Sequence, residues 1–305
     1  MYDSIIIGGG PAGMSAALYL ARKKMKIVLI SPEFGGQAAK SAEVENYLGY
    51  TKISGPELTT KFTEHIEAIG VETKTAEVKS VAKKDSSFEV KTSDEALESK
   101  SVIVASGKTP RKLNIPGEKE LLGKGIGYCA TCDGPLFKDK VVTVIGGGNS
   151  ALDAALEMEK YAQKVYVINL NEYFQGDEIR KDRVKNSEKI EVINKAQTLE
   201  AIGSQFLEKI KYKDLSTNTE KEIASSGMFV EIGWQPATEI VQNLVELNNL
   251  KEIKIDRENK TSVEGIFACG DVTDIKEKQI IIAAGEGAKA ALSAWKFIVT
   301  RKEIG

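Results

Sequence analysis

Two cysteines three residues apart are the side chains of this sequence best suited to chemistry. Cys129 and Cys132 form a C-x-x-C motif within GYCATCDGPLF, and Asp133 follows directly. At this spacing two thiols can close a small disulfide ring, in which one thiol is placed to attack as the other leaves. Asp133 can protonate a departing thiolate, or it can serve only as a helix cap or a turn residue.

A zinc site would need further ligands beside these two cysteines. The chain has three cysteines and one histidine, and both Cys269 and His65 lie far from the motif in sequence. We therefore expect no metal site and interpret the cysteine pair as a redox centre. Cys269 is expected in the core and His65 at the surface or at a helix cap.

The composition is that of an ordinary globular protein. The 305 residues carry a net charge of -2, and 42% of them are hydrophobic. This balance indicates neither a nucleic acid nor a membrane surface as partner. No apolar run approaches the ~18 residues that cross a bilayer, and the N-terminus lacks the pattern of a signal peptide. We expect a cytoplasmic protein.

An internal duplication defines the elements that must position the cysteines. Residues 4–30 (SIIIGGGPAGMSAALYLARKKMKIVLI) align without a gap with residues 142–168 (VTVIGGGNSALDAALEMEKYAQKVYVI), an offset of 138. Each copy reads as a short apolar strand, a glycine turn, a helix and a second strand, which is a βαβ unit.

The glycines of both copies suit a dinucleotide. The first permits a tight turn, and the second lets a pyrophosphate approach the backbone at the positive end of the helix. At the third position, Gly13 or Ala151 lets helix and strand pack closely. The alternative is that the glycines only serve a sharp turn. Two such turns in register, each between a strand and a helix, predict two dinucleotide-binding folds.

Glycine- and proline-containing segments at 107–118 and 233–238 bracket the second copy. We predict an α/β protein with two Rossmann-like domains of the three-layer ββα type, the second inserted into the first. The first would comprise residues 1–112 and 238–305, and the second residues 113–237. Residues 70–105 and 192–232 are expected to form small antiparallel accessory sheets, and an apolar helix is expected over residues 280–300.

Several motifs together resemble the low-molecular-weight thioredoxin reductases. Beside CATCDG they are GGGPAG, GGQ, VENYLG, VASG, VIGGGNSA, GDV and KQI, at residues 8–13, 35–37, 44–49, 104–107, 144–151, 270–272 and 278–280. The match runs along the whole sequence. The resemblance implies FAD in the first domain. It assigns FAD contacts to Gly8, Gly10, Pro11, Ala12, Gly13, Glu33, Gly36, Gln37, Asn46, Val78, Gly107, Gly270, Asp271, Gln279 and Ile280.

The resemblance also implies an activity. Reduced flavin would pass two electrons to the Cys129–Cys132 disulfide, and the dithiol would reach thioredoxin or a thioredoxin-like protein after rotation of the second domain. We expect Cys132 to lie nearer the flavin. A homodimer formed through the FAD domains is expected as well.

One segment departs from the resemblance. NADPH-dependent members carry a His-Arg-Arg-x-x-x-Arg run after the second strand of the second domain, where arginines bind the 2′-phosphate. Residues 169–175 read NLNEYFQ, which contains no basic side chain. We therefore predict that NADPH is not the donor. The sequence is similar to the ferredoxin-dependent, NADPH-independent members, so ferredoxin or another non-nicotinamide donor is favoured, and NADH is the alternative.

Three alternative functions differ from this prediction in particular features. A ferredoxin–NADP reductase of similar architecture would lack the cysteine pair. A reductase for a peroxidase component usually carries an additional N-terminal disulfide domain, which we do not expect here. The remaining alternative is a flavin-bound redox-sensing protein that does not turn over.

Overall fold

The computed structural model describes residues 1–41 and 44–304, without the side chains of Cys132 and of residues 301–304. The chain divides into two compact units. Unit 1 comprises Met1–Thr109 and Gln235–Gly305, and unit 2 is Pro110–Trp234. The sequence predicts residues 113–237 for the inserted segment, so each boundary of unit 2 lies close to its predicted position.

Unit 1 is built around a seven-stranded sheet of order β3-β2-β1-β6-β5-β4, with β17 paired to β6. Its strands are β1 (Tyr2–Gly9), β2 (Ile27–Phe34), β3 (Glu72–Thr75), β4 (Val78–Lys83), β5 (Phe88–Thr92), β6 (Ala96–Val104) and β17 (Ile266–Ala268). Its helices are α1 (Pro11–Arg22), η1 (Gly36–Lys40), α2 (Gly55–Ala68), η3 (Gly270–Val272) and α6 (Ile280–Ile304).

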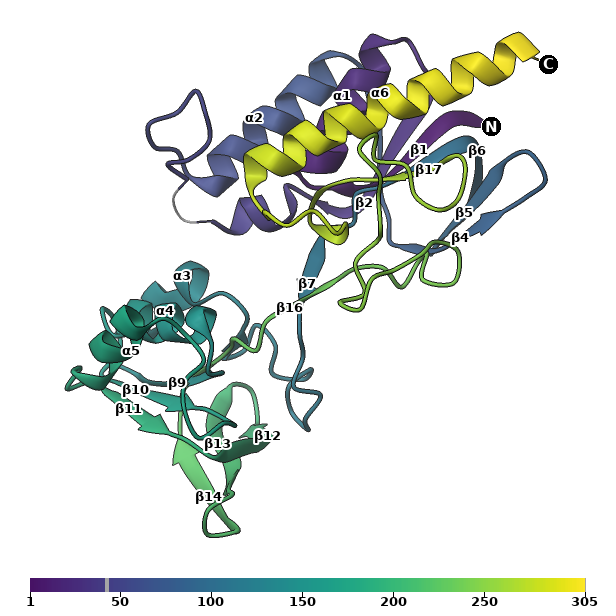
Figure 1. Ribbon diagram of the computed structural model, residues 1–305. Helices are drawn as coiled ribbons and strands as arrows, with labels where there is room; N and C mark the ends of the chain where they lie inside the picture. Colours follow the sequence, from purple (N-terminus) through teal and green to yellow (C-terminus); the bar gives the residue numbers. More distant parts are fainter. Residues whose placement is uncertain (42–43, 305) are drawn as a thin grey trace. The chain divides into compact units, whose positions relative to one another are not determined.

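Alternation along β1 explains the layers of unit 1. Successive side chains of a strand point to opposite faces of the sheet. Ile6 packs in the cluster that includes residues of α1 and α6, whereas Ile5 and Ile7 pack with Val81 and Val90 of β4 and β5. Figure 1 shows α1, α2 and α6 grouped on one side of this sheet.

The accessory strands of unit 1 differ from the expected separate sheet. β4 and β5 are antiparallel, but β5 pairs with the first part of β6, whose second part pairs in parallel with β1 and β17. β3 is a parallel neighbour of β2 and not part of the antiparallel hairpin. One long strand therefore joins both sheet types.

Unit 2 repeats the plan with a five-stranded parallel sheet of order β11-β10-β9-β15-β8 and a three-stranded antiparallel sheet. The parallel strands are β8 (Ile126–Gly127), β9 (Val141–Ile145), β10 (Lys164–Ile168), β11 (Ile190–Ile193) and β15 (Gly227–Val230). The antiparallel strands are β12 (Ala196–Gly203), β13 (Leu207–Asp214) and β14 (Thr219–Ala224). The helices are α3 (Ala130–Asp133), η2 (Gly134–Phe137), α4 (Asn149–Met158) and α5 (Glu178–Lys185).

The core of unit 2 also lies on both faces of its parallel sheet. Phe229 packs with residues of α4, and its neighbours Met228 and Val230 pack with residues of β12 and β13. This order of helices, parallel sheet and antiparallel sheet is the three-layer α/β arrangement that the sequence predicted, and the prediction of fold class is confirmed.

The two connections between the units pair as a two-stranded ribbon of β7 (Lys108–Pro110) and β16 (Trp234–Pro236). Hydrogen bonds continue the ribbon on both sides. Ala237 N–H donates to the Gly107 carbonyl over 3.0 Å, and Arg111 N–H donates to the Gly233 carbonyl over 2.9 Å.

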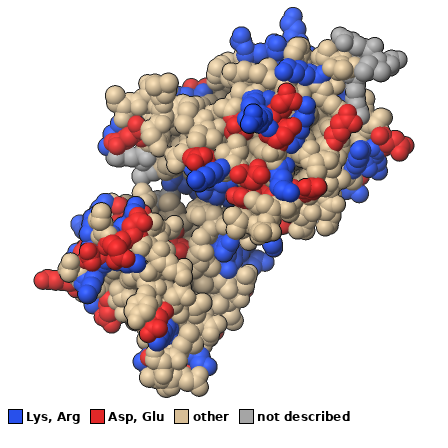
Figure 2. Space-filling model, in the orientation of Figure 1, with Lys and Arg blue, Asp and Glu red and all other residues tan. Residues whose placement is uncertain are grey.

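The surface carries both signs of charge. Figure 2 shows acidic and basic side chains interspersed over the visible face, in keeping with the small net charge. Within the described residues, every helix is either too short or too polar to span a bilayer.

Candidate functional site

The cysteine motif begins shortly after β8 and continues into α3 of unit 2. Cys129 is disulfide-bonded, and the Asp133 N–H donates to its carbonyl over 3.3 Å. The backbone of Cys132 lies within α3, and its side chain is outside the described residues. Cys129 is thus part of a disulfide, and its role in a redox pair stays a prediction.

Asp133 lies at the end of α3, half-buried against β8. Its Oδ2 is 2.8 Å from the position that a Cβ of Gly127 would take, so this glycine makes room for the carboxyl. Asp133 precedes η2, but its side chain makes no capping hydrogen bond there. Burial raises the pKa of the Asp133 carboxyl above its usual range. A carboxyl that holds its proton more tightly is better suited to protonating a thiolate of the neighbouring motif.

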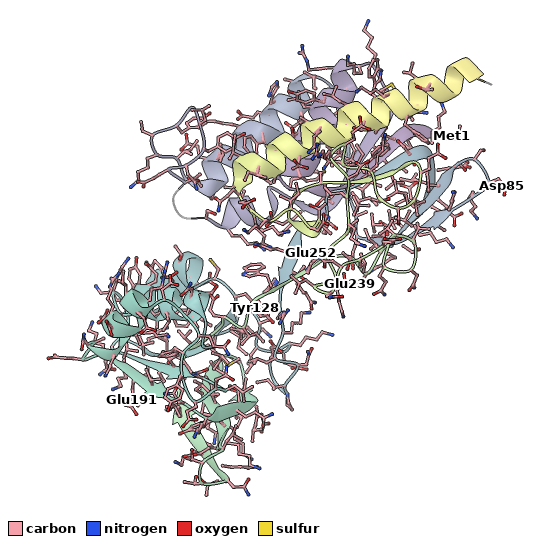
Figure 3. All side chains as sticks on the ribbon, in the orientation of Figure 1. Met1, Asp85, Tyr128, Glu191, Glu239 and Glu252 are labelled. Carbon is pink, nitrogen blue, oxygen red and sulfur yellow. The ribbon has the colours of Figure 1, made fainter. Side chains whose placement is uncertain are left out.

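A cavity of about 380 Å³ opens beside the disulfide. Its wall includes Cys129, Thr131, Ser150 and Trp234, so the disulfide and the N-terminal turn of α4 share one space. Tyr128, labelled in Figure 3, also lines it, and its hydroxyl donates to the buried Glu118 carboxylate over 2.9 Å. Cys129 therefore borders a cavity formed within unit 2.

The first glycine loop forms an open cradle at the N-terminus of α1. Gly8 has a φ of +114°, and a Cβ there would lie 2.2 Å from the Ala105 carbonyl oxygen. A Cβ on Gly13 would lie 1.8 Å from the Gly8 carbonyl oxygen, so helix and strand meet backbone to backbone. Gly10, by contrast, faces open space, and Pro11 starts the helix. The N–H groups of this first turn are the donors that a pyrophosphate uses.

Other predicted FAD contacts converge on this cradle. Gly36 starts η1 with a φ of +55°, and a Cβ there would lie 3.1 Å from the Gly10 Cα. Gly270 starts η3, where a Cβ would lie 2.9 Å from that of Ala12. Gln37 follows Gly36 in η1 and is half-buried. Glycines on three separate segments therefore keep the space around the α1 N-terminus clear.

Further residues that were predicted to contact FAD take part in a hydrogen bond and an ion pair. Asn46 Nδ2 donates to Gln279 Oε1 over 3.1 Å, which links segments 233 residues apart in sequence. Asp271 forms an ion pair with Lys108 at 3.2 Å. Lys108 was not among the predicted site residues, although it follows Gly107, whose φ is +69° and which faces open space. Ile280, at the start of α6, packs on the small cluster of Val44, Ile53 and Leu58.

Glu33 and Val78 lie on strands of the same sheet. Glu33 is exposed near the end of β2, with its carboxylate 3.3 Å from Lys40 Nζ. This is the strand end at which an acidic group contacts a ribose. Val78 begins β4 and is buried, with its side chain in the core.

The polar side chain at the strand end of the second copy is already hydrogen-bonded to other residues of the protein. Asn169, only 1% exposed, donates from Nδ2 to Asn194 Oδ1 over 2.9 Å and accepts at Oδ1 from Asn171 N–H over 3.2 Å. Glu172 forms an ion pair with Lys195 at 2.7 Å. Residues 169–175 contain no arginine, and the amide of Asn169 at the strand end is already hydrogen-bonded within the protein.

Sequence reasoning missed Glu231. This residue follows β15 and lines the cavity beside the disulfide. Burial, and after it the nearby Asp153, raise the pKa of Glu231 to about 7. A longer alignment of the duplication would have found it, because VIVASG at residues 102–107 matches MFVEIG at residues 228–233, with Glu231 opposite Ala105.

Cys269 is fully buried in the core of unit 1, and its thiol is free. Burial raises its pKa well above the usual range for a thiol. His65 lies in the last turn of α2 at the surface. Both positions agree with the structural roles that the sequence suggested.

Comparison with known proteins shows which family shares this arrangement. Residues 2–288 match the family described as pyridine nucleotide-disulphide oxidoreductase. The chain is 41% identical over 300 residues to the F component of the alkyl hydroperoxide reductase of Staphylococcus epidermidis. That alignment covers 98% of this chain and 59% of the relative, so the chain spans about three-fifths of the length of such curated relatives.

Solved structures of similar length also match. The thioredoxin reductase of Lactococcus lactis is 39% identical, with a TM-score of 0.83, and the alignment covers 98% of this chain and 100% of that one. The ferredoxin-flavin thioredoxin reductase of Clostridium acetobutylicum is 32% identical, with a TM-score of 0.55 and coverage of 98% of both chains. The expected resemblance to thioredoxin reductases is confirmed at the level of the family.

These relatives are flavoproteins, and FAD is the cofactor of this chain. The residues of unit 1 fit that group. Gly10 and Gly107 face open space beside a cradle in which Gly8, Gly36 and Gly270 have positive φ values.

Proposed function

This chain belongs to the pyridine nucleotide-disulphide oxidoreductase family, and from that premise we propose that it is a flavoprotein disulfide reductase for thioredoxin or a thioredoxin-like protein. The observation that carries the proposal is the disulfide at Cys129, which borders an open cavity and is followed by a carboxyl with a raised pKa. A structural disulfide would need neither feature.

The cysteines would work as a carrier of two electrons. Reduction of the Cys129–Cys132 disulfide breaks its S–S bond and takes up two electrons and two protons. FAD, once reduced by the donor, would supply these two electrons, and Gly8, Gly10, Gly13 and the surrounding residues of unit 1 would hold it. One thiolate then attacks the disulfide of the acceptor protein, forming a mixed disulfide and releasing one acceptor thiolate.

The second thiolate closes the cycle. It attacks the mixed disulfide, the Cys129–Cys132 bond forms again, and the acceptor leaves as a dithiol. Asp133 would hold and deliver the proton for a departing thiolate, because burial keeps its carboxyl protonated to higher pH than an exposed carboxyl.

The donor in this proposal is not NADPH. The residues at the end of β10 include no arginine, and the Asn169 amide is held by Asn171 and Asn194. Ferredoxin or another non-nicotinamide donor is favoured, and the similarity to a ferredoxin-flavin thioredoxin reductase supports this choice. NADH remains the alternative donor.

Anaerobic mixing of the FAD-loaded protein with each donor tests this part. NADPH and NADH at millimolar concentration should leave the flavin absorbance unchanged, whereas reduced ferredoxin should bleach it. Reduction by dithionite is the control that the flavin is competent. Rapid bleaching by either nucleotide would contradict the donor assignment.

Cysteine variants test the disulfide step. Cys129→Ser and Cys132→Ser should each lower the rate of thioredoxin reduction by at least ~10³-fold, because neither can form the internal disulfide. Both should retain FAD. Cys269→Ala is the matched control, since that thiol is buried and free, and it should keep the rate. Unchanged turnover in either serine variant would favour the redox-sensing alternative.

The identity to the F components of staphylococcal alkyl hydroperoxide reductases favours a second candidate acceptor, a component of a peroxide-reducing system. The same turnover assay separates the two acceptors. Faster reduction of thioredoxin supports our proposal, and exclusive reduction of a peroxidase component would replace it. We further propose a homodimer, which sedimentation equilibrium of the holoprotein tests.

A further inference from the structure

Ala105 lies next to the first glycine loop, at the carboxyl end of a strand in the sheet of unit 1. It follows β6, and its N–H donates to the Ile7 carbonyl over 2.8 Å. Its own carbonyl oxygen lies 2.2 Å from the position of a Cβ on Gly8. A small side chain therefore stands next to the glycine loop where the FAD pyrophosphate is expected.

Glu231 occupies the equivalent place in unit 2. It follows β15, and its N–H donates to the Ile145 carbonyl over 2.8 Å. Its carbonyl oxygen lies 2.2 Å from the position of a Cβ on Gly146. The backbone contacts match those of Ala105 one for one, so the two side chains leave the main chain at the same point of the fold.

Glu231 lies at the end of the sheet where ligands bind in folds of this type. β9 lies between β10 and β15, and the chain leaves β9 through α4 toward β10. In an open parallel sheet, ligands bind at the carboxyl ends of the strands where neighbouring connections diverge. Glu231 stands at the carboxyl end of β15, directly beside the second glycine loop.

The cavity around this carboxyl carries charges of both signs. Charged or titratable groups that share its cavity come from several segments: Asp153 and Glu157 of α4, Lys160 after it, Arg183 of α5, and Tyr128 and Cys129 before α3. Lys160 is paired with Glu157 at 2.6 Å, and Asp153 is paired with Arg180 at 2.6 Å. In the part of the chain that the structure describes, no hydrogen bond or ion pair engages the Glu231 carboxyl.

We propose that Glu231 is a specificity residue that excludes pyrophosphate-containing dinucleotides from unit 2. Its side chain leaves the main chain where unit 1 has the methyl group of Ala105, and it lines the same cavity as Ser150 in the first turn of α4. A pyrophosphate on that turn would meet a negative charge in place of open space. The inference rests on the proposed function, in which the electrons do not come from a nicotinamide.

The charge of Glu231 depends on pH in the physiological range. Burial and the neighbouring Asp153 hold its pKa at about 7, so the carboxylate is fully charged only above that pH. Repulsion of a pyrophosphate therefore grows as pH rises from 6 to 8. Cys129 does not titrate while it is disulfide-bonded.

Binding of NAD⁺ to the oxidised holoprotein tests the inference without turnover. Isothermal titration calorimetry would compare wild type with Glu231→Gln, which keeps the shape, and Glu231→Ala, which copies unit 1. At pH 8 both variants should bind NAD⁺ at least ~10-fold more tightly than wild type, because one neutralised charge corresponds to about one decade or more. The flavin spectrum and circular dichroism report correct folding.

The pH series and a matched control sharpen the result. Wild-type affinity should rise between pH 8 and pH 6, while the affinity of both variants should stay constant. Glu157→Gln is the control, because this carboxylate lines the same cavity but already has Lys160 as partner, and it should bind NAD⁺ as wild type does.

Two outcomes would overturn the inference. In the first, Glu231→Gln and Glu231→Ala bind NAD⁺ no more tightly than wild type. In the second, Glu157→Gln gains as much affinity as they do. Neither outcome touches the proposed function, which fails separately if NADH or NADPH rapidly bleaches the flavin of the wild-type protein.

Discussion

The glycine loops of the two units share a backbone design and differ in what surrounds it. Gly8 and Gly146 both have positive φ values and both lie against the carbonyl of the strand beyond. Gly10 and Gly148 both face open space. Around the first loop the neighbouring side chain is a methyl group, and around the second it is the Glu231 carboxyl.

The residues at the ends of β2 and β10 also differ in whether they can reach a ligand. Glu33, at the end of β2, is exposed and can reach a ligand. Asn169, after β10, is buried, and its amide is used within the protein. The comparison teaches that a glycine loop provides the backbone for a dinucleotide, whereas the side chains at the neighbouring strand ends decide whether one can bind.

The largest expected effect comes from moving the charge to unit 1. Ala105→Glu should weaken FAD binding by at least ~100-fold, because a carboxylate would stand next to the α1 N-terminus, where we propose that the pyrophosphate binds. Ala105→Gln, of the same shape, separates charge from size and should lose far less. Equilibrium dialysis of FAD against the refolded apoproteins measures both. Equal losses in the two variants would show that bulk alone decides the site.

A comparable effect is expected from adding one methyl group to either loop. Gly8→Ala and Gly146→Ala should each destabilise their own unit by about 2–4 kcal/mol, because the Cβ meets a carbonyl oxygen at 2.2 Å and φ is unfavourable. Only Gly8→Ala should also release FAD. Urea unfolding and the flavin content of the purified protein provide the two readouts. Loss of FAD from Gly146→Ala would contradict the inference that only the first loop binds FAD.

The smallest effect concerns stability and pH at Glu231. Its folded pKa of about 7 lies above the usual 4.5, so the folded protein holds this proton more tightly. The stability that the proton provides is fully present below pH 4.5 and is lost as pH rises to 7. Glu231→Gln should therefore exceed wild type by on the order of 1–3 kcal/mol at pH 8 and match it near pH 4.5. Denaturant titrations at both values test this, and a difference independent of pH would contradict it.

The duplication made the central part of both sheets predictable. A strand, a glycine turn and a helix follow one another in each copy, and this local order determines a parallel βαβ unit. The cysteine motif was predictable for the same reason, since its chemistry depends on two residues three apart. Residues 72–75 were placed wrongly in the antiparallel accessory sheet, because a short polar strand carries no local sign of its pairing partner.

Site residues that depend on long-range contacts were harder to find. Lys108 contributes through its pair with Asp271, and Glu231 through its place beside Gly146. Neither residue belongs to a motif. The ion pair joins segments far apart in sequence, which only the folded chain shows, and Glu231 is found from sequence only when the alignment of the two copies is extended beyond the βαβ units.

Because Cys269 is buried, an alkylating reagent can be used to count the thiols that reduction of the disulfide releases. Its side chain has no exposed surface, and its raised pKa keeps it protonated. Thiolates are the species that alkylating reagents attack. The folded oxidised protein should therefore resist labelling, and each pair of labels taken up under mild reduction would report one opened disulfide. Mass spectrometry after alkylation would therefore measure the fraction of molecules in a preparation whose disulfide is reduced.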